Sequence, residues 1–128
     1  MSEFSKALSI SSSGLQAQAS RLRHLSENIS NVDTPGYRRK MIPFDTVVKD
    51  GVSQVEPGRM SLDDRPLERI FDPSHPLADE TGHYEGSNVQ LLIEIADARE
   101  AQRSYEANLK MFEQARQMSS GLMQLLRR

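Results

Sequence analysis

The amino-acid sequence predicts a mainly α-helical protein in which two long helices, one at each end of the chain, pair as a coiled coil around a small, irregular, β-rich middle. Three observations predict this fold class. Apolar side chains recur at heptad spacing near both ends. Five of the six prolines and four of the seven glycines lie within residues 43–86. Aromatic residues make up only 5% of the chain, too few for an ordinary globular core. We therefore expect an N-terminal helical domain in residues 1–34, a middle segment in 35–87 and a C-terminal helical domain in 88–128.

The N-terminal helix is predicted by apolar residues at strict intervals of seven, namely Leu8, Leu15, Leu22 and Ile29. Leu25 lies on the second position of the same stripe. Serines, alanines and one glycine surround the first half of the stripe. Serine and glycine lower helix propensity, whereas small side chains let two helices approach closely. Such a helix can also pack on its own domain, but two long stripes at opposite ends of the chain favour an N–C helical pair.

A turn and a basic triplet follow this helix. Pro35-Gly36 is a strong turn signal, and the residue before a proline is biased towards extended geometry. Residues 38–40 read Arg-Arg-Lys. They could contact an acidic partner or a phosphate, or they could lie in a solvated turn, since three charges are few for a binding tract.

Residues 41–87 contain short apolar pieces separated by turn residues, which predicts two to four short strands. Val52 to Val55 and Ile70-Phe71 are the clearest candidates, and Glu56-Pro57-Gly58 is typical of a turn. The apolar content of this segment is too low for an independent core.

Four residues of the middle segment have the chemistry of metal ligands or acid–base groups: Asp72, His75, Asp79 and His83. They lack helical His-x-x-x-His spacing, and prolines run through the segment. We interpret it as a stiff connection to the C-terminal helix, which Ser87 or Asn88 could cap. No nucleophile motif or phosphate-binding glycine loop occurs elsewhere. The sequence therefore predicts neither an enzyme nor a metal or cofactor site.

The C-terminal helix is predicted by residues 88–126, which contain no proline and one glycine. Its apolar or bulky residues alternate at steps of four and three, with one gap at Gln102, and include Leu91, Ile95, Tyr105, Leu109 and Phe112. Beyond this stretch the spacing changes and the stripe drifts. About 39 residues at about 1.5 Å each would form a rod of about 58 Å. A helix of this length would extend past the rest of the chain, so we expect it to need a partner.

Composition excludes several classes of function. The formal net charge of -2 is evenly spread, so no basic field favours nucleic acid or an anionic membrane. The absence of cysteine excludes disulfides, thiolate metal sites and cysteine nucleophiles. No apolar run approaches the ~20 residues of a membrane span. The N-terminus lacks the features of a cleaved secretory signal, so we expect any export to use a route that keeps it.

Three segments carry a resemblance to a known family. SENISNVDTPGYRRK (residues 26–40) and SNVQLLIEIADAREAQRSYEANLKMFEQARQM (residues 87–118) resemble the terminal signatures of bacterial flagellar rod and hook axial proteins. FDPSHPLADETGHY (residues 71–84) is similar to the proximal rod proteins within that family. The resemblance extends over nearly the full chain.

The resemblance implies a structural protein of the basal body that assembles helically into the rod, connects the basal disc to the distal rod and hook, and transmits torque. It implies that the terminal helices form an inner coiled-coil layer, ordered on assembly, under an outer middle segment. Implied partners are further copies of the chain, rod proteins of the FlgB, FlgF, FlgG and FliE types, and the flagellar type III export apparatus, through which the chain would leave the cytoplasm to span the periplasm. No nucleic acid, small-molecule substrate or cofactor is implied.

We expect the interaction seam to consist of Leu8, Leu15, Leu22, Leu25, Ile29, Leu91, Ile95, Tyr105, Leu109 and Phe112. Polar contacts between subunits are expected from Asn28, Asn31, Asn88 and Asn108. Two other hypotheses stay open at this point. One is a soluble helical adaptor or export chaperone of the flagellar system. The other is a small metal-dependent enzyme built on the Asp and His residues of the middle segment.

Overall fold

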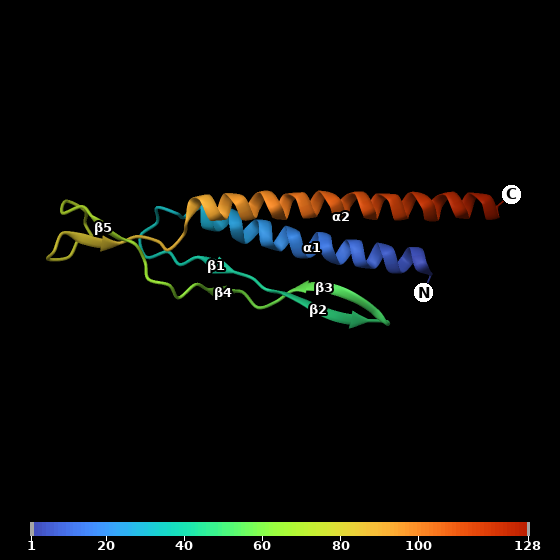
Figure 1. The fold of residues 1–128 in the computed structure, drawn as a ribbon, viewed down its shortest axis with the longest axis horizontal. Coiled ribbons are helices and arrows are strands. Elements are labelled where there is room, and N and C mark those ends of the chain that lie inside the picture. Colours follow the sequence, from blue (N-terminus) through green and yellow to red (C-terminus); the bar gives the residue numbers. More distant parts are fainter. Residues whose placement is uncertain (1, 128) are drawn as a thin grey trace.

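A computed structural model of the chain describes residues 2–127. Helix α1 (Glu3–Ser30) and helix α2 (Leu91–Leu126) lie side by side and run in opposite directions (Figure 1). The strands between them form three separate two-stranded sheets. The expected fold class is confirmed at this level: two long terminal helices with small antiparallel sheets in between.

Helix α1 begins after Ser2, whose hydroxyl accepts a hydrogen bond from the backbone N–H of Ser5 at 3.1 Å. This N-cap satisfies one of the donors that a helix start leaves free. Glu3 lies in the first turn, where its charge suits the helix dipole. The helix contacts α2 along one side and strand β3 along another. Its buried residues are mostly small or polar: Ser11, Ser13, Ala17, Leu25 and Asn28.

Helix α2 begins at Leu91, and its N-cap, Gln90, makes no side-chain capping bond. The predicted cap at Ser87 or Asn88 is therefore wrong. These two side chains instead bond to backbone groups elsewhere: the Ser87 hydroxyl donates to the carbonyl of Val32 at 2.5 Å, and the Asn88 amide holds the segment after α1. The C-terminal end of α2 extends past the start of α1 (Figure 1).

The middle segment forms three antiparallel pairs. Strand β1 (Lys40–Met41) pairs with β4 (Ser61–Leu62), β2 (Phe44–Lys49) with β3 (Val52–Pro57), and β5 (Arg69–Phe71) with β6 (His83–Glu85). Six strands exceed the predicted two to four. The predicted turn at residues 56–58 is also wrong. Residues 56 and 57 complete β3, and the N–H of Gly58 extends the ladder to the carbonyl of Pro43 at 2.7 Å.

The turn between β2 and β3 lies at Asp50-Gly51. Both residues have positive φ angles, 53° and 75°. Two successive left-handed residues are characteristic of a type I′ hairpin, for which Asp-Gly is a preferred sequence. The hairpin packs along α1, with the N–H of Val55 donating to the Ser13 hydroxyl at 3.2 Å.

The interior of the described chain is small. Its buried hydrophobic residues are Ala17, Leu25, Val52, Val89, Ala101 and Ala115, and three of these six are alanines. Eighteen large hydrophobic side chains among residues 2–127 are exposed. Neither described helix is apolar enough over a sufficient length to cross a membrane.

Candidate assembly surface and the polar junction that positions it

A polar junction joins the end of α1, the start of α2 and strand β1. At its centre lie Asn28 and Glu94, both 0% exposed. The Asn28 amide bonds both backbone groups of Lys40: Nδ2 donates to the carbonyl at 2.9 Å, and Oδ1 accepts from the N–H at 2.8 Å. Oδ1 also accepts from the Tyr37 hydroxyl at 2.8 Å. The Asn28 side chain thus satisfies the backbone N–H and carbonyl of Lys40 in the way that a neighbouring strand would. These bonds fix where β1 begins.

Glu94 is bonded from two sides. Its Oε2 accepts from Asn28 Nδ2 at 3.3 Å, and its Oε1 forms an ion pair with Nε of Arg39. The Arg39 guanidinium also lies 3.7 Å from Asp63 Oδ2 and 3.5 Å from Asp97 Oδ2. Three carboxylates therefore surround one guanidinium. A buried carboxylate is costly unless it is paired and hydrogen-bonded, and Glu94 meets both conditions.

The side-chain amide of Asn88, which precedes α2, also bonds to the polar junction. Its Oδ1 accepts from the N–H of Arg39 at 2.7 Å, and its Nδ2 donates to the carbonyls of Asp63 and Arg65 at 2.9 and 3.1 Å. The segment before α2 is thereby tied both to the segment after α1 and to the loop after β4. Together with Asn28 and Glu94, it fixes the relative position of the two helices.

The charges around the junction are stabilised in their ionised forms. A hydrogen bond from Arg65 lowers the pKa of Asp63 below its usual range, and a hydrogen bond from Lys40 lowers the pKa of Glu27. The same contact raises the pKa of Lys40. Burial raises the pKa of the Tyr37 hydroxyl, which keeps it protonated as a donor to Asn28.

The basic triplet at residues 38–40 contributes to this network. Arg39 pairs with Glu94, Lys40 pairs with Glu27, and the Arg38 guanidinium donates to the carbonyls of Asp63 and Arg65 at 3.2 and 3.1 Å. The triplet is therefore an internal clamp between segments. The sequence alone suggested only an external contact or a solvated turn.

The two helices meet along a stripe of small and polar residues. On α2 this stripe has an interval of seven and consists of Glu94, Ala101, Asn108 and Ala115. At its middle the backbone of Gly14 approaches Asn108 closely, since a Cβ at position 14 would lie 2.7 Å from Asn108 Oδ1. Arg21 lies opposite, 4.0 Å from Asp97 and 3.9 Å from Glu100. Within one chain, the most buried positions of the helix contact are thus small or polar, and ion pairs flank them.

The apolar stripe expected from the sequence lies next to this contact on α2. Leu91, Ile95 and Leu109 are 43%, 37% and 38% exposed, and Tyr105 and Phe112 are half-buried. On α1, Leu25 is buried, whereas Leu8, Leu15, Leu22 and Ile29 are half-buried. The α1 stripe is thus partly covered by the rest of the chain, and the α2 stripe lies mainly at the surface.

Helix α2 exposes large hydrophobic side chains at its start, in residues 91–95, and from residue 109 to its end. Of the eighteen exposed large hydrophobic residues, eleven lie on this helix: Leu91, Leu92, Ile93, Ile95, Leu109, Met111, Met118, Leu122, Met123, Leu125 and Leu126. Apolar surface of this extent is uncommon on a monomeric protein and marks an interaction surface. We take it as the candidate assembly surface.

The four predicted asparagines lie in different environments. Asn28 and Asn88 are buried and bonded within the chain, as described above. Asn31 Nδ2 donates to the carbonyl of Glu27 at 2.8 Å, and Asn108 Nδ2 donates to that of Ser104 at 3.0 Å. Contacts of these side chains with a neighbouring subunit stay a prediction.

The residues considered for metal binding belong to the β5–β6 hairpin and its connecting loop. This hairpin lies at the end of the molecule opposite the start of α1 and the end of α2 (Figure 1). The ring of His75 stacks on Tyr84 at 3.8 Å between centroids, and His83 lies edge-on to Phe71. The Asp79 carboxylate accepts from the N–H groups of Thr81 and His83, and its hydrogen bond with Thr81 lowers its pKa. In the part of the chain that the structure describes, no three His, Cys, Asp or Glu side chains gather closely enough to hold a metal ion.

Comparisons with known proteins agree with this arrangement. Residues 8–38 match the family model described as flagella basal body rod protein, and residues 80–125 match that described as flagellar basal body rod FlgEFG protein C-terminal. The chain is 40% identical to the flagellar basal-body rod protein FlgC of Agrobacterium fabrum, over 99% of this chain and 98% of the relative. It is 33% identical to FlgC of Aquifex aeolicus (88% and 89%) and 30% identical to FlgC of Bacillus subtilis (80% and 85%).

Proposed function

Because the chain belongs to the FlgC family of flagellar basal-body rod proteins, and is therefore a structural subunit of the rod and not an enzyme, we propose that it enters the rod through the apolar face of α2. The observation that carries the proposal is the eleven large hydrophobic side chains exposed on this helix. Their burial between subunits would be the main driving force for assembly.

The seam of the assembled rod would combine the residues expected from the heptad spacing. Leu8, Leu15, Leu22, Leu25 and Ile29 would contribute from α1, and Leu91, Ile95, Tyr105, Leu109 and Phe112 from α2. The support is geometric. The most buried positions of the chain's own helix contact are small or polar, and Leu91, Ile95 and Leu109 of the α2 stripe stay exposed for other subunits.

The proposed division of labour follows the order of the chain. Residues 1–34 and 88–128 would form an inner coiled-coil domain, and residues 35–87 an outer layer that the polar junction holds in place. Asn31 and Asn108, which are half-buried, would be the more accessible of the four asparagines for polar contacts between subunits. Other copies of the chain and other rod proteins would surround each subunit.

The delivery of the chain is also part of the proposal. A small interior rich in alanine and serine makes the isolated chain weakly stable, which suits export as an unfolded chain through the flagellar type III apparatus. Ordering at the growing tip would then complete a rod that spans the periplasm and transmits torque. The free energy of the new interfaces would offset the entropy lost on ordering.

Quantitative mass spectrometry of washed basal bodies tests the location. The measured quantity is the copy number of this chain relative to a ring protein. Several copies per particle that resist salt and detergent support a rod subunit. A chain absent from the particle and folded in the cytosol would instead support the adaptor hypothesis.

The seam itself is tested by Leu109→Asp and Leu22→Asp. Leu109 is 38% exposed in the single chain, so its replacement should leave the helix intact but place an unpaired charge in the subunit interface. We expect the copy number per basal body to fall by about tenfold or more. Leu109→Met is the matched control and should assemble normally. Normal rods built from Leu109→Asp protein would contradict the proposed seam.

A further inference from the structure

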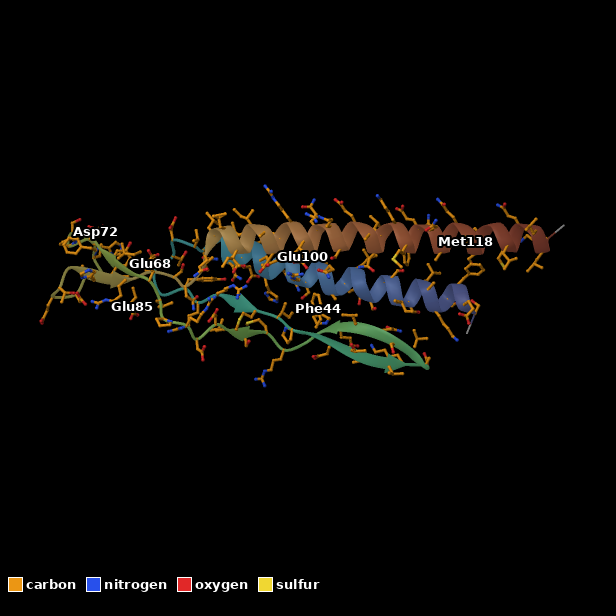
Figure 2. The ribbon with its side chains drawn as sticks, viewed as in Figure 1. Phe44, Glu68, Asp72, Glu85, Glu100 and Met118 are labelled. Carbon is orange, nitrogen blue, oxygen red and sulfur yellow. The ribbon has the colours of Figure 1, made fainter. Side chains whose placement is uncertain are left out.

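The two ends of the molecule differ in charge. The β5–β6 lobe, residues 66–86, contains five acidic residues (Glu68, Asp72, Asp79, Glu80 and Glu85) and one arginine, so its formal net charge is -4 with neutral histidines. The last turns of α2, residues 114–127, contain two arginines and no acidic residue. Figure 2 shows Glu68, Asp72 and Glu85 at one end of the molecule and Met118 towards the other.

Both ends also expose apolar side chains. Where α2 begins, beside the acidic lobe, Leu91, Leu92, Ile93 and Ile95 form an exposed collar, with Leu92 82% exposed. Where α2 ends, Leu122, Met123, Leu125 and Leu126 are exposed, with Leu126 at 75%. The two apolar groups are separated by about 27 residues of helix, or about 40 Å at 1.5 Å per residue. A single contact cannot cover both apolar groups of one molecule, so each group needs a binding partner of its own.

A hollow lies between the acidic lobe and the collar. Its volume is about 460 Å³, and it is lined by Arg65, Pro66, Glu68, Ser87, Asn88, Val89 and Gln90. The hollow therefore combines the exposed carboxylate of Glu68 with the exposed amide of Gln90, which could donate to a free carbonyl of a helix C-terminus.

We propose that the collar, the hollow and the acidic lobe together receive the C-terminal end of an axial helix from the next subunit in the rod. The occupant has the chemistry that α2 itself displays: leucine and methionine side chains, arginine near the tip and no acidic residue. Apolar contact with the collar supplies the adhesion. The carboxylates of the lobe select a basic tip over an acidic one and set the orientation.

This contact is heterologous, because it joins two different surfaces of neighbouring subunits. Heterologous contacts that do not close into a ring build open helical assemblies. A head-to-tail contact would also place the negative end of one helix dipole near the positive start of the next. The inference rests on the proposed function, since it requires that subunits stack in the rod.

Photo-crosslinking in native basal bodies tests the contact. A p-benzoylphenylalanine placed at Leu92 should crosslink to the last turns of an axial C-terminal helix, identified by mass spectrometry of the joined peptides. The matched control places the same group at Val48, which is 68% exposed on β2. It should not capture that helix end.

The charge complementarity is tested in the same particles. Replacing Glu80→Lys and Glu85→Lys together should lower the Leu92 crosslink yield by about tenfold, because like charges then face each other. The control Asp64→Lys alters an exposed acidic residue outside the lobe and should leave the yield unchanged. Circular dichroism of the variants establishes that the helices are retained.

The outcomes separate this inference from the proposed function. If the chain is missing from washed basal bodies, the proposed function fails. If the chain is present but Leu92 crosslinks to an N-terminal helix, to a middle segment or to nothing, only the docking inference is overturned. Crosslinking to a C-terminal helix end that is unaffected by the charge reversals would overturn the assigned role of the acidic lobe.

Discussion

The close approach of Gly14 to Asn108 leads to a prediction about the helix pair. In an open helix, Gly→Ala is stabilising by about 1 kcal/mol, because alanine loses less backbone freedom. At Gly14 the new Cβ would lie 2.7, 2.8 and 2.9 Å from three atoms of the Asn108 side chain. Asn108 would have to rotate and break its 3.0 Å bond to the carbonyl of Ser104.

The expected sign follows from these magnitudes. Overpacking costs about 1–3 kcal/mol and the lost hydrogen bond about 1 kcal/mol, against a gain of about 1 kcal/mol. Gly14→Ala should therefore lower the free energy of unfolding by about 1–3 kcal/mol. For a chain of this size, that corresponds to a fall in Tm of about 4–11 °C. Circular dichroism at 222 nm during heating, in an osmolyte that favours the compact state, measures the change.

Two further variants make the test specific. In an Asn108→Ala background the obstruction is gone, so Gly14→Ala should become stabilising by about 1 kcal/mol. Gly121→Ala is the matched control in α2, because no atom lies within 4 Å of a Cβ built there, and it should also stabilise. The reasoning would be refuted if Gly14→Ala had the same effect with and without Asn108.

Three shorter predictions concern the junction, the hairpin and acid. Glu94→Ala should lower the free energy of unfolding by about 3 kcal/mol, since it removes the buried carboxylate that pairs with Arg39 and bonds to Asn28, and Glu94→Gln by less; chemical denaturation measures both, and equal stability of Glu94→Ala and the parent would contradict the junction's role. Gly51→Val should speed amide hydrogen exchange in β2 and β3 but not in α2, because φ at this residue is 75° and a β-branched residue is strained there; unchanged exchange would exclude the assigned turn. The pKa values of Glu27 and Asp63 are lowered from 4.5 and 3.8, so their stabilisation is present above those values and is lost as pH falls through the folded-state pKa. Tm should thus drop on acidification below about pH 4.5, and Asp63→Asn should reduce the drop; a Tm independent of pH would argue against both contacts.

The helices were predictable because each carries a long periodic stripe without proline. The β2–β3 hairpin is also encoded locally in the sequence, by a pair of residues that favours a type I′ turn. Val47-Val48, then Lys49, and then Asp50-Gly51 followed by Val52 is the pattern of a tight hairpin. A turn was predicted at Pro57-Gly58 because both residues are typical of turns, although a proline at a strand end is also common.

The pairing register on α2 could not be obtained from hydrophobic spacing. Spacing locates an apolar stripe but does not say which partner covers it. In the structure Tyr105 and Phe112 of the predicted stripe are half-buried, but the other half of the stripe is displaced by one position, from Ile95 and Leu109 to Glu94 and Asn108. A fully buried carboxylate has no signature in a single sequence, since its partner Asn28 is 66 residues away along the chain.

The displaced register has a consequence for how stability is divided between the subunit and the rod. The most buried positions of the helix contact are small or polar, and Leu25 alone of the predicted seam is fully buried, so the separate subunit gains little from hydrophobic burial. The large side chains of α2 remain available, and burying even five of them between subunits would supply on the order of 10 kcal/mol. A helix pair built the other way, with its leucines turned inward, would be more stable alone and would have less to gain by assembling. The polar junction is compatible with this division, because its hydrogen bonds fix the position of the helices without covering the apolar face of α2.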